Sequence, residues 1–314
     1  MEITVVGAGV IGLVTTLALE QAGHRVRIVA AANGARTTSD IAGAVWFPYR
    51  VGPPDRVALW AAQTRTWLEE LASDVASGVD VLTGYEITAE PGEDTGTTPS
   101  RPWWAAHIDV TRAPAPVMGA PLAWKFTAPR VEPAVFLPWL TARLTARIEQ
   151  RTVTDLAAEP GDVVINCTGL GARSLVGDHE MVALYGQIAI AQLGGIDPRV
   201  TITDNRGADI FYLIPRRGEI VLGGCSLPRS PDAPTDHSGS PDSAITARIL
   251  EQAASLGLQV GATTRERTGL RPYRPAVRLE RDVDPRIIHN YGHGGAGFTL
   301  CRGCADEVVR LLRT

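Results

Sequence analysis

Three glycines near the N-terminus have the spacing of a turn that binds the phosphates of a dinucleotide. They stand in Gly7-Ala-Gly9-Val-Ile-Gly12, after residues 3–6, which are predicted to form a short buried strand, and before a helical pattern that ends at Gly23. In such a turn the glycines allow a tight bend, a close approach of the backbone to a pyrophosphate, and close packing of helix on strand. The N-terminus of the helix then faces the phosphates. The pattern predicts a dinucleotide site, and the alternative is a tight turn without a ligand.

The acidic residue that usually binds the ribose of such a ligand is missing. It is expected near the end of a second strand, residues 25–29, but the sequence there continues Ala30-Ala31-Ala32-Asn33. Arg36 could instead meet a phosphate, although an exposed arginine near a loop is also often just solvated. The contacts to the adenosine half of a dinucleotide are therefore open.

Two dense clusters of polar residues and glycines lie near the C-terminus. One is Gly269-Leu-Arg271-Pro-Tyr-Arg274-Pro-Ala-Val-Arg278-Leu-Glu280, and the other is Asn290-Tyr-Gly292-His-Gly294-Gly295-Ala-Gly297-Phe-Thr299. A final helix is expected from there to Leu312. A nicotinamide-dependent dehydrogenase would share the N-terminal glycine pattern but would need neither cluster.

The four cysteines, Cys167, Cys225, Cys301 and Cys304, are too few and too scattered for a secreted disulfide framework. The pair Cys301-Arg-Gly-Cys304 supplies only half a zinc site, so we predict no metal. The spacing does not decide whether these two cysteines pair with each other.

Composition indicates a globular protein of about two domains. Apolar residues make up 45% of the 314 residues and charged residues 20%, as expected for a chain that folds by burial. The net charge is −4 and no basic stripe is present, so nucleic acid is not an expected partner. The N-terminal apolar residues follow Glu2 and are interrupted by glycines, which fits neither a signal peptide nor a membrane span. We therefore expect no membrane association and a cytoplasmic location.

The pattern of strands and helices predicts two interleaved regions. A βαβ beginning at residue 3 is followed by helical patterns at 57–71 and from Pro133 to Gln150. The apolar strand Asp162 to Asn166 then returns to a parallel sheet, because its residues suit burial on both faces. Residues 181–224 alternate as in an antiparallel sheet, and a polar loop from Pro228 to Ser243 leads to a helix that ends at Gly257.

Five motifs together resemble the D-amino-acid oxidase family of FAD enzymes. They are the N-terminal glycine turn, Asp40-Ile-Ala-Gly-Ala-Val-Trp46-Phe-Pro48-Tyr49, Asn166-Cys-Thr-Gly-Leu-Gly-Ala-Arg173, Tyr212-Leu-Ile-Pro215 and the two C-terminal clusters, in unbroken order. The resemblance implies an α/β fold, in which a Rossmann-like FAD-binding domain with a parallel sheet is interleaved with an α+β substrate domain built on a large antiparallel sheet. We place the FAD-binding domain at 1–50, 130–180 and 268–314, and the substrate domain at 51–129 and 181–267.

The resemblance also implies the reaction and its main residues. A neutral D-amino acid would give a 2-oxo acid, ammonia and hydrogen peroxide by hydride transfer from Cα to flavin N5, with O2 reoxidising the flavin. Arg271 matches the arginine that grips the substrate carboxylate, as a guanidinium can with two bonds, and Tyr212 matches the tyrosine that adds a further bond. Gly295 matches the carbonyl that receives the ammonium. The alternatives are a surface ion pair for Arg271 and sheet packing for Tyr212; His293 is expected to be structural, not a general base.

The cofactor is expected to be a non-covalently bound FAD. Glycines leading into a helix N-terminus would point N–H groups at the flavin, where negative charge appears on reduction. The residues that match FAD-binding positions are Gly7, Gly9, Val10, Ile11, Gly12, Arg36, Thr37, Thr38, Ser39, Ala42, Gly43, Ala44, Thr168, Gly169, Gly294, Gly295, Ala296, Gly297, Phe298 and Thr299.

The region that would surround the substrate side chain is apolar. Val45, Phe47, Tyr49 and Ile214 are expected to line it, with no second arginine that the sequence places there. Burying an unpaired substrate carboxylate is costly, so neutral D-amino acids are favoured over D-aspartate. The segment Asp204 to Phe211 resembles the family's active-site lid but is shorter than in some members, with Ala208 where a lid tyrosine would stand. We expect a more open site in which product release is less gated.

Alternatives remain within this resemblance and outside it. A D-aspartate or glycine oxidase of the same family is possible, and so is a flavin-binding protein without catalysis. The family resemblance further implies a homodimer.

Overall fold

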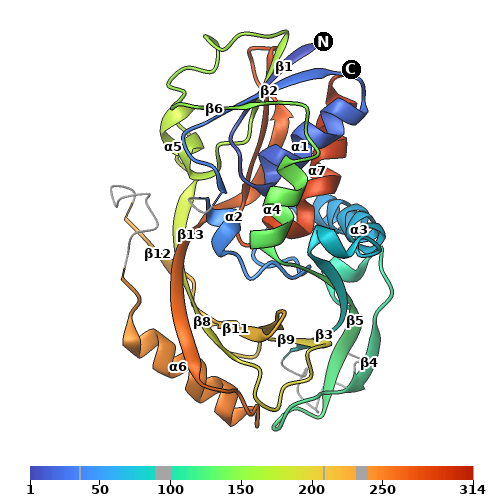
Figure 1. Cartoon of the computed structure of the whole chain (residues 1–314), viewed down its shortest axis with the longest axis vertical. Coiled ribbons are helices and arrows are strands. Elements are labelled where there is room, and N and C mark those ends of the chain that lie inside the picture. Colours follow the sequence, from blue (N-terminus) through green and yellow to red (C-terminus); the bar gives the residue numbers. More distant parts are fainter. Residues whose placement is uncertain (35–36, 89–100, 208, 231–239, 314) are drawn as a thin grey trace.

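One hydrogen-bonded sheet runs through the whole molecule. The computed structural model describes residues 1–34, 37–88, 101–207, 209–230 and 240–313 (Figure 1). The strand order is β4-β5-β3-β9-β10-β11-β8-β13-β14-β7-β1-β2-β6, with β12 pairing β8 off this path. Neighbours from β14 to β6 are parallel, whereas the other neighbours are antiparallel except β3 and β9. The predicted parallel and antiparallel regions are therefore both present, joined edge to edge.

The parallel end begins with the predicted βαβ unit. Strand β1 (Glu2–Val6) leads through the glycine turn into α1 (Val10–Gln21) and then into β2 (Arg25–Ala30). Strand β7 (Val163–Asn166) is buried throughout and pairs with β1, which confirms the return to the parallel sheet. On its other side lies β14 (Ile287–His293).

The helix predicted from Pro133 to Gln150 was too long. Helix α4 covers only Pro133–Thr141, and the chain then forms the edge strand β6 (Ile148–Gln150). Two contacts account for the difference. Strand β6 gains a ladder with β2, and the backbone N–H groups of Thr145 and Ala146 donate to the carboxylate of Glu20 on α1 at 3.1 and 2.7 Å. Both interactions are made with residues far away in the sequence, which local periodicity does not register.

The antiparallel end is a curved sheet that one long strand, β13, connects to the parallel end. Strand β13 (Thr263–Arg281) pairs with β8 (Val182–Gln192) over its first half and with β14 over its second, and an irregularity between Tyr273 and Arg278 lies in the second pairing. In Figure 1 it runs in orange from the lower end of the molecule to the upper. The remaining strands are β3 (Val79–Ile87), β4 (Thr111–Pro114), β5 (Leu122–Val131), β9 (Val200–Asp204), β10 (Phe211–Pro215), β11 (Glu219–Gly223) and β12 (Leu227–Pro228).

Helices cover the parallel end. Helix α7 (Gly297–Leu311) packs against both α1 and α3 (Pro54–Leu71), and Gly303 of α7 is needed there because an added Cβ would lie 2.4 Å from the backbone of Trp60. Helix α3 falls within the range predicted for the substrate domain, yet its partner α7 belongs to the range predicted for the FAD-binding domain. The other helices are α2 (Thr38–Ile41), α5 (Ala172–Leu175) and α6 (Ser243–Ser255), with 3-10 turns at Val75–Ser77, Trp103–Ala105 and Gly169–Gly171. No helix in the described ranges is long and apolar enough to cross a membrane.

Candidate active site

A cavity of about 670 Å³ extends from the glycine turn to the antiparallel sheet. Most residues predicted for the site line it. These are Gly7, Gly9, Val10, Ile11, Thr37, Thr38, Ser39, Ala42, Gly43, Ala44, Val45, Phe47, Tyr49, Thr168, Gly169, Tyr212, Ile214, Arg271, Gly294, Gly295, Gly297 and Phe298. Segments from near both ends of the chain, such as Gly7 and Phe298, therefore meet around one cavity.

Three predicted residues stand behind the cavity wall. A Cβ on Gly12 would lie 2.0 Å from the carbonyl oxygen of Gly7, so this glycine serves close packing. Ala296 is fully buried at the start of α7. The hydroxyl of Thr299 accepts from the N–H of Phe47 at 3.2 Å and donates to its carbonyl at 3.0 Å, which fixes a wall segment from behind. Arg36, the fourth, lies outside the described residues.

Two helix N-termini face the cavity without a side-chain cap. Helix α1 begins after Gly9 and α7 after Ala296, and neither has an acidic residue in its first turn. The hydroxyl of Ser39 accepts from the N–H of Val10 at 2.9 Å. At Gly7 the backbone has a φ of +118°, and a Cβ would lie 2.3 Å from the carbonyl oxygen of Cys167. Uncapped N-termini behind a glycine turn suit a bound anion.

Arg271 lines the cavity with a guanidinium that has no carboxylate partner among the described residues. It projects from β13, and its Nη1 donates to the carbonyl of Cys225 at 2.8 Å. Within the part of the chain that the structure describes, the cavity wall holds two other arginines, and both are paired with carboxylates: Arg151 with Glu159 at 2.6 Å and Arg267 with Asp40 at 2.5 Å. Among the described residues, no carboxylate lies within ion-pair distance of Arg271. A carboxylate ligand would supply the missing partner.

Two glycines that the sequence analysis did not single out make room for this arrangement. A Cβ on Gly186 of β8 would lie 2.4 Å from Nη1 of Arg271, and a Cβ on Gly223 of β11 would lie 2.1 Å from the ring of Tyr212. Tyr212 hydrogen-bonds to Arg271, and burial raises the pKa of its hydroxyl, which therefore stays protonated. Glycines inside strands were the available signal, because they often mark a close approach.

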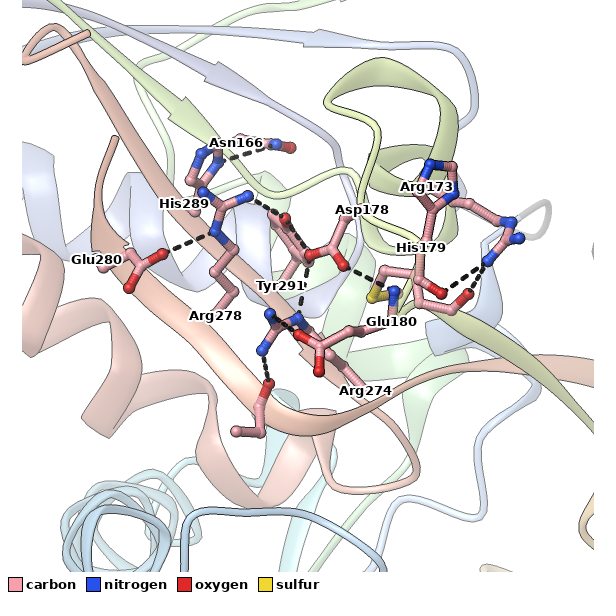
Figure 2. A network of polar contacts seen from close by, with 12 residues as sticks. Asn166, Arg173, Asp178, His179, Glu180, Arg274, Arg278, Glu280, His289 and Tyr291 are labelled. Carbon is pink, nitrogen blue, oxygen red and sulfur yellow. Dashed lines mark hydrogen bonds and ion pairs between the residues drawn. The ribbon is translucent and has the colours of Figure 1, made fainter. Parts of the chain in front are cut away.

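The other arginines of the motif are structural. Tyr291 lies between Arg278 and Asp178, donating to the carboxylate of Asp178 at 2.7 Å and accepting from Arg278 at 3.0 Å (Figure 2). Arg274 donates to Asp178 at 3.0 Å and also pairs with Glu180. The ion-pair alternative concerns Arg271, but ion pairs are found at Arg274 and Arg278, whereas Arg271 lines the cavity and has no carboxylate within ion-pair distance among the described residues.

Comparison with known proteins identifies the family. A family model described as FAD dependent oxidoreductase matches residues 2–311. The chain belongs to this FAD-dependent oxidoreductase family. Among its relatives, a D-amino-acid oxidase of Streptomyces coelicolor is 39% identical over 99% of this chain and 96% of its own length. A D-aspartate oxidase of Homo sapiens is 30% identical over 99% of this chain and 94% of its own length.

The fold of this oxidoreductase is shared with solved enzymes. A glycine oxidase of Bacillus cereus matches with a TM-score of 0.76 and 17% identity, over 99% of this chain and 96% of that one. An L-proline dehydrogenase of P. horikoshii has the same TM-score at 14% identity, over 99% and 92%. The comparisons confirm the predicted family, the mixed α/β fold and FAD as the cofactor.

The cavity of the oxidoreductase fits FAD except at one point. The glycine turn and the two uncapped helix N-termini suit a diphosphate and the negative charge of a reduced flavin. At the far end, Ala30, Ala31 and Ala32 line the wall where a ribose carboxylate was expected. Residues 151–154 line the cavity beside them, and the N–H of Arg151 donates to the carbonyl of Ala30 at 3.1 Å. The sequence analysis missed this segment because β6 was taken for helix.

The end of the cavity at Tyr212, where the sequence predicts the substrate side chain, is largely apolar. Ile188 and Ile214 pack with Val45 and Tyr212 in one cluster, and Ile210 and Thr203 also line the wall. One expectation needs correction. A second arginine, Arg267, does line the cavity, but its guanidinium is held by Asp40 through the carboxylate and through the carbonyl at 3.2 Å. A paired guanidinium offers little to a second carboxylate.

His293 lines the cavity as a neutral side chain. Burial lowers the pKa of its imidazole to about 3, and its Nε2 has no hydrogen-bond partner within the described part of the chain. So weak a base suits the structural role predicted for it. The four cysteines are free and buried, Cys301 and Cys304 included. Among the described residues, no group of three His, Cys, Asp or Glu side chains is placed to hold a metal ion.

The segment that resembles a lid is anchored to β3. Asn205 donates to the carboxylate of Glu86 at 2.7 Å, and Trp104 donates to its other oxygen at 3.0 Å. Glu86 is only 5% exposed, and this burial raises the pKa of its carboxyl to about 7. Ala208, on which the prediction of a more open site rests, lies outside the described residues.

We predict that Gly186→Ala weakens substrate use without loss of FAD. The added Cβ would meet the Arg271 guanidinium at 2.4 Å, so the guanidinium must move. A displacement of about 1 Å costs about 100-fold in kcat/KM, mostly through KM, in steady-state assays. Gly195→Ala is the control, because its Cβ would come no closer than 3.3 Å to Oε1 of the flexible Gln259 side chain and 3.8 Å to the backbone carbonyl oxygen of the same residue. Unchanged kinetics in the Gly186 variant would contradict the prediction.

We predict that Glu86 makes stability depend on pH. The folded carboxyl, with a pKa of about 7, holds a proton that the unfolded chain releases above about pH 4.5. The free energy of unfolding should therefore fall as the pH rises from about 4.5 to 7, by at most about 3 kcal/mol from this group. Glu86→Gln, which resembles the protonated acid, should flatten this slope in urea unfolding at several pH values. An equal slope in both proteins would refute the assignment.

Proposed function

We propose that this oxidoreductase oxidises neutral D-amino acids. The substrate, water and O2 give a 2-oxo acid, ammonia and hydrogen peroxide. The observation that carries the proposal is the guanidinium of Arg271, which faces the cavity beside Tyr212 with no carboxylate partner among the described residues. The D-amino-acid oxidases of Streptomyces coelicolor and Rubrobacter xylanophilus, which are 39% and 37% identical to this chain, support the stereochemical choice.

The site residues would hold the substrate at three points. Arg271 would bind the α-carboxylate through two parallel N–H bonds, and the hydroxyl of Tyr212 would donate a further one. The carbonyl of Gly295 would accept from the amino group, and a Cβ at Gly295 would lie 3.4 Å from the Arg271 side chain, so these two groups are neighbours. Anchoring at three points fixes which bond of Cα faces the cofactor.

FAD, when bound, supplies the acceptor for the hydride that leaves Cα. The chain's part is to bind, orient and exclude water. No general base from the chain is needed once the amine is neutral, and His293, with a pKa of about 3, is too weak a base for that task. The uncapped N-terminus of α7 would stabilise negative charge on the ring system.

Specificity for neutral side chains follows from the apolar wall. Val45, Ile188 and Ile214 offer contact area but no hydrogen-bond donor for a second carboxylate. Oxidation of D-aspartate is the alternative to this proposal, because a D-aspartate oxidase of Homo sapiens is 30% identical to this chain. For this alternative, Arg267 would have to release the carboxylate of Asp40 and bind the side-chain carboxylate of the substrate instead.

We also propose a division of the chain into two domains, an oligomeric state and a location. Residues 1–50, 130–180 and 268–314 would bind FAD and the two other ranges the substrate, which the distribution of parallel and antiparallel strands supports. We further propose a homodimer in the cytoplasm. Four free thiols suit a reducing compartment, and light scattering of the purified protein tests the dimer.

We predict that Arg271→Met strongly lowers kcat/KM for D-amino acids while the protein keeps its flavin. Removing the guanidinium from a buried ion pair with substrate should lower kcat/KM for D-alanine about 1,000-fold. Arg271→Lys should recover only part of it, because an ammonium lacks the fork of two donors. Peroxide release and the visible spectrum of each variant are measured together.

The matched control is Arg265→Met on the same strand, where the side chain is exposed and pairs with Glu219 at 2.7 Å. Its kinetics should equal those of the parent. Full activity in Arg271→Met would refute the proposed carboxylate site, and a parent that binds FAD but oxidises no D-amino acid would identify a flavin-binding protein without catalysis.

A further inference from the structure

The wall segment from Ala42 to Trp46 has an unusual backbone. Ala42, Gly43 and Ala44 line the cavity, and Ala44 has a φ of +58°. A non-glycine residue in the left-handed region costs about 1 kcal/mol or more and persists only where the surroundings enforce it. A side chain at Gly43 would require Ile214 to move, because an added Cβ would lie 2.8 Å from Cδ1 of Ile214. Something must hold this segment in its conformation.

Strand β5 holds the segment at one end only. The N–H of Val131 donates to the carbonyl of Ala44 at 2.8 Å, and the N–H of Trp46 donates to the carbonyl of Pro129 at 2.8 Å. These bonds fix the residues from Ala44 onward. They do not reach the carbonyls of Ala42 and Gly43, which precede the strained residue.

Arg216 holds the other end. Its Nη2 donates to the carbonyl of Ala42 at 2.7 Å and lies 3.5 Å from the carbonyl of Gly43. The residue is 9% exposed and comes from the turn between β10 and β11, so it reaches the segment from across the sheet. A charged donor to a buried carbonyl makes a stronger hydrogen bond than a neutral one.

A buried carboxylate lies beside Arg216 and joins its turn to β5. Oε2 of Glu132 lies 3.8 Å from Nε of Arg216, while its Oε1 accepts from Arg130 at 2.6 Å and from the N–H of Arg217 at 3.0 Å. Arg130 in turn donates to the carbonyl of Pro215 at 3.0 Å. This network ties the β10–β11 turn to the end of β5, and both the turn and β5 contact the Ala42–Trp46 segment.

We propose that Arg216 is a positioning residue for FAD. By clamping the carbonyls of Ala42 and Gly43 it keeps Ala44 in the left-handed conformation, so that the cavity wall has the shape that accepts the cofactor. The inference rests on FAD as the cofactor and on the position of this segment in the cavity wall, and it does not depend on which substrate is oxidised.

Arg217 provides a matched control in the neighbouring position. Its side chain is 46% exposed and reaches Asp80 at 3.7 Å and the carbonyl of Val75 at 3.3 Å, away from the cavity wall. Both arginines leave the same turn, so Arg216→Met and Arg217→Met remove the same chemical group. Only the first releases Ala42.

The test is a titration of apo-protein with FAD, followed by quenching of FAD fluorescence in the absence of any amino acid. Arg216→Met should raise the Kd for FAD about tenfold and change the visible flavin spectrum, whereas Arg217→Met should leave both unchanged. In the Arg216→Met background, Ala44→Gly should restore at least half of the lost affinity on a logarithmic scale, because glycine adopts a positive φ without strain. A merely stabilising role for Arg216 would not give this rescue.

An unchanged Kd and spectrum in Arg216→Met, or an equal loss in both arginine variants, would overturn the proposal. If Arg216→Met does not fold, Arg216→Lys replaces it in the same titration. A single lysine ammonium cannot reach Glu132 and both carbonyls in the way that the arginine guanidinium does. The Kd for FAD should therefore rise a few-fold in Arg216→Lys, and an unchanged Kd would contradict the proposal. Since no substrate is present, a failure here leaves the proposed oxidase activity untouched.

Discussion

Strand β13 is hydrogen-bonded to β8 along its first half and to β14 along its second, and the site depends on this double pairing. The pairing with β8 places Arg271 against Gly186 and below Tyr212 of β10, while the pairing with β14 places the same strand beside the glycine cluster that leads into α7. The two halves of the cavity thus share one backbone. A shift in either register would separate the guanidinium from the glycine cluster that leads into α7.

Charge pairing singles out one cation for function. Arg151, Arg267, Arg274 and Arg216 each have a buried or half-buried carboxylate neighbour, which holds their side chains to structural tasks. Arg271 has a carbonyl and a tyrosine hydroxyl instead. The Arg271 guanidinium is half-buried, and a carboxylate ligand would supply the anion that it lacks among the described residues. The arrangement supports the proposal that Arg271, and not Arg274, is the ligand-binding arginine of the motif.

Much of the fold and of the site could be predicted from sequence because the relevant signals are local. The glycine turn, the buried strand before Cys167 and the helix after Gly297 each carry their own pattern of glycines and apolar residues. The rest depends on pairing between distant residues. The end of α4 is set by Glu20 and by β2, the space for Arg271 is set by Gly186, and the pairing of Arg267 with Asp40 joins residues 227 positions apart. Composition and periodicity carry no record of such contacts.

The central claim is that a carboxylate bound by Arg271 places a neutral D-amino acid for oxidation by FAD. The most direct measurement is the visible spectrum of the purified protein during anaerobic titration with D-alanine, D-valine, L-alanine and D-aspartate in turn. The account predicts that the flavin band bleaches with the two neutral D-amino acids, does so weakly or not at all with L-alanine and D-aspartate, and returns with peroxide when air is admitted. Bleaching by D-aspartate alone, or by no amino acid, would contradict it.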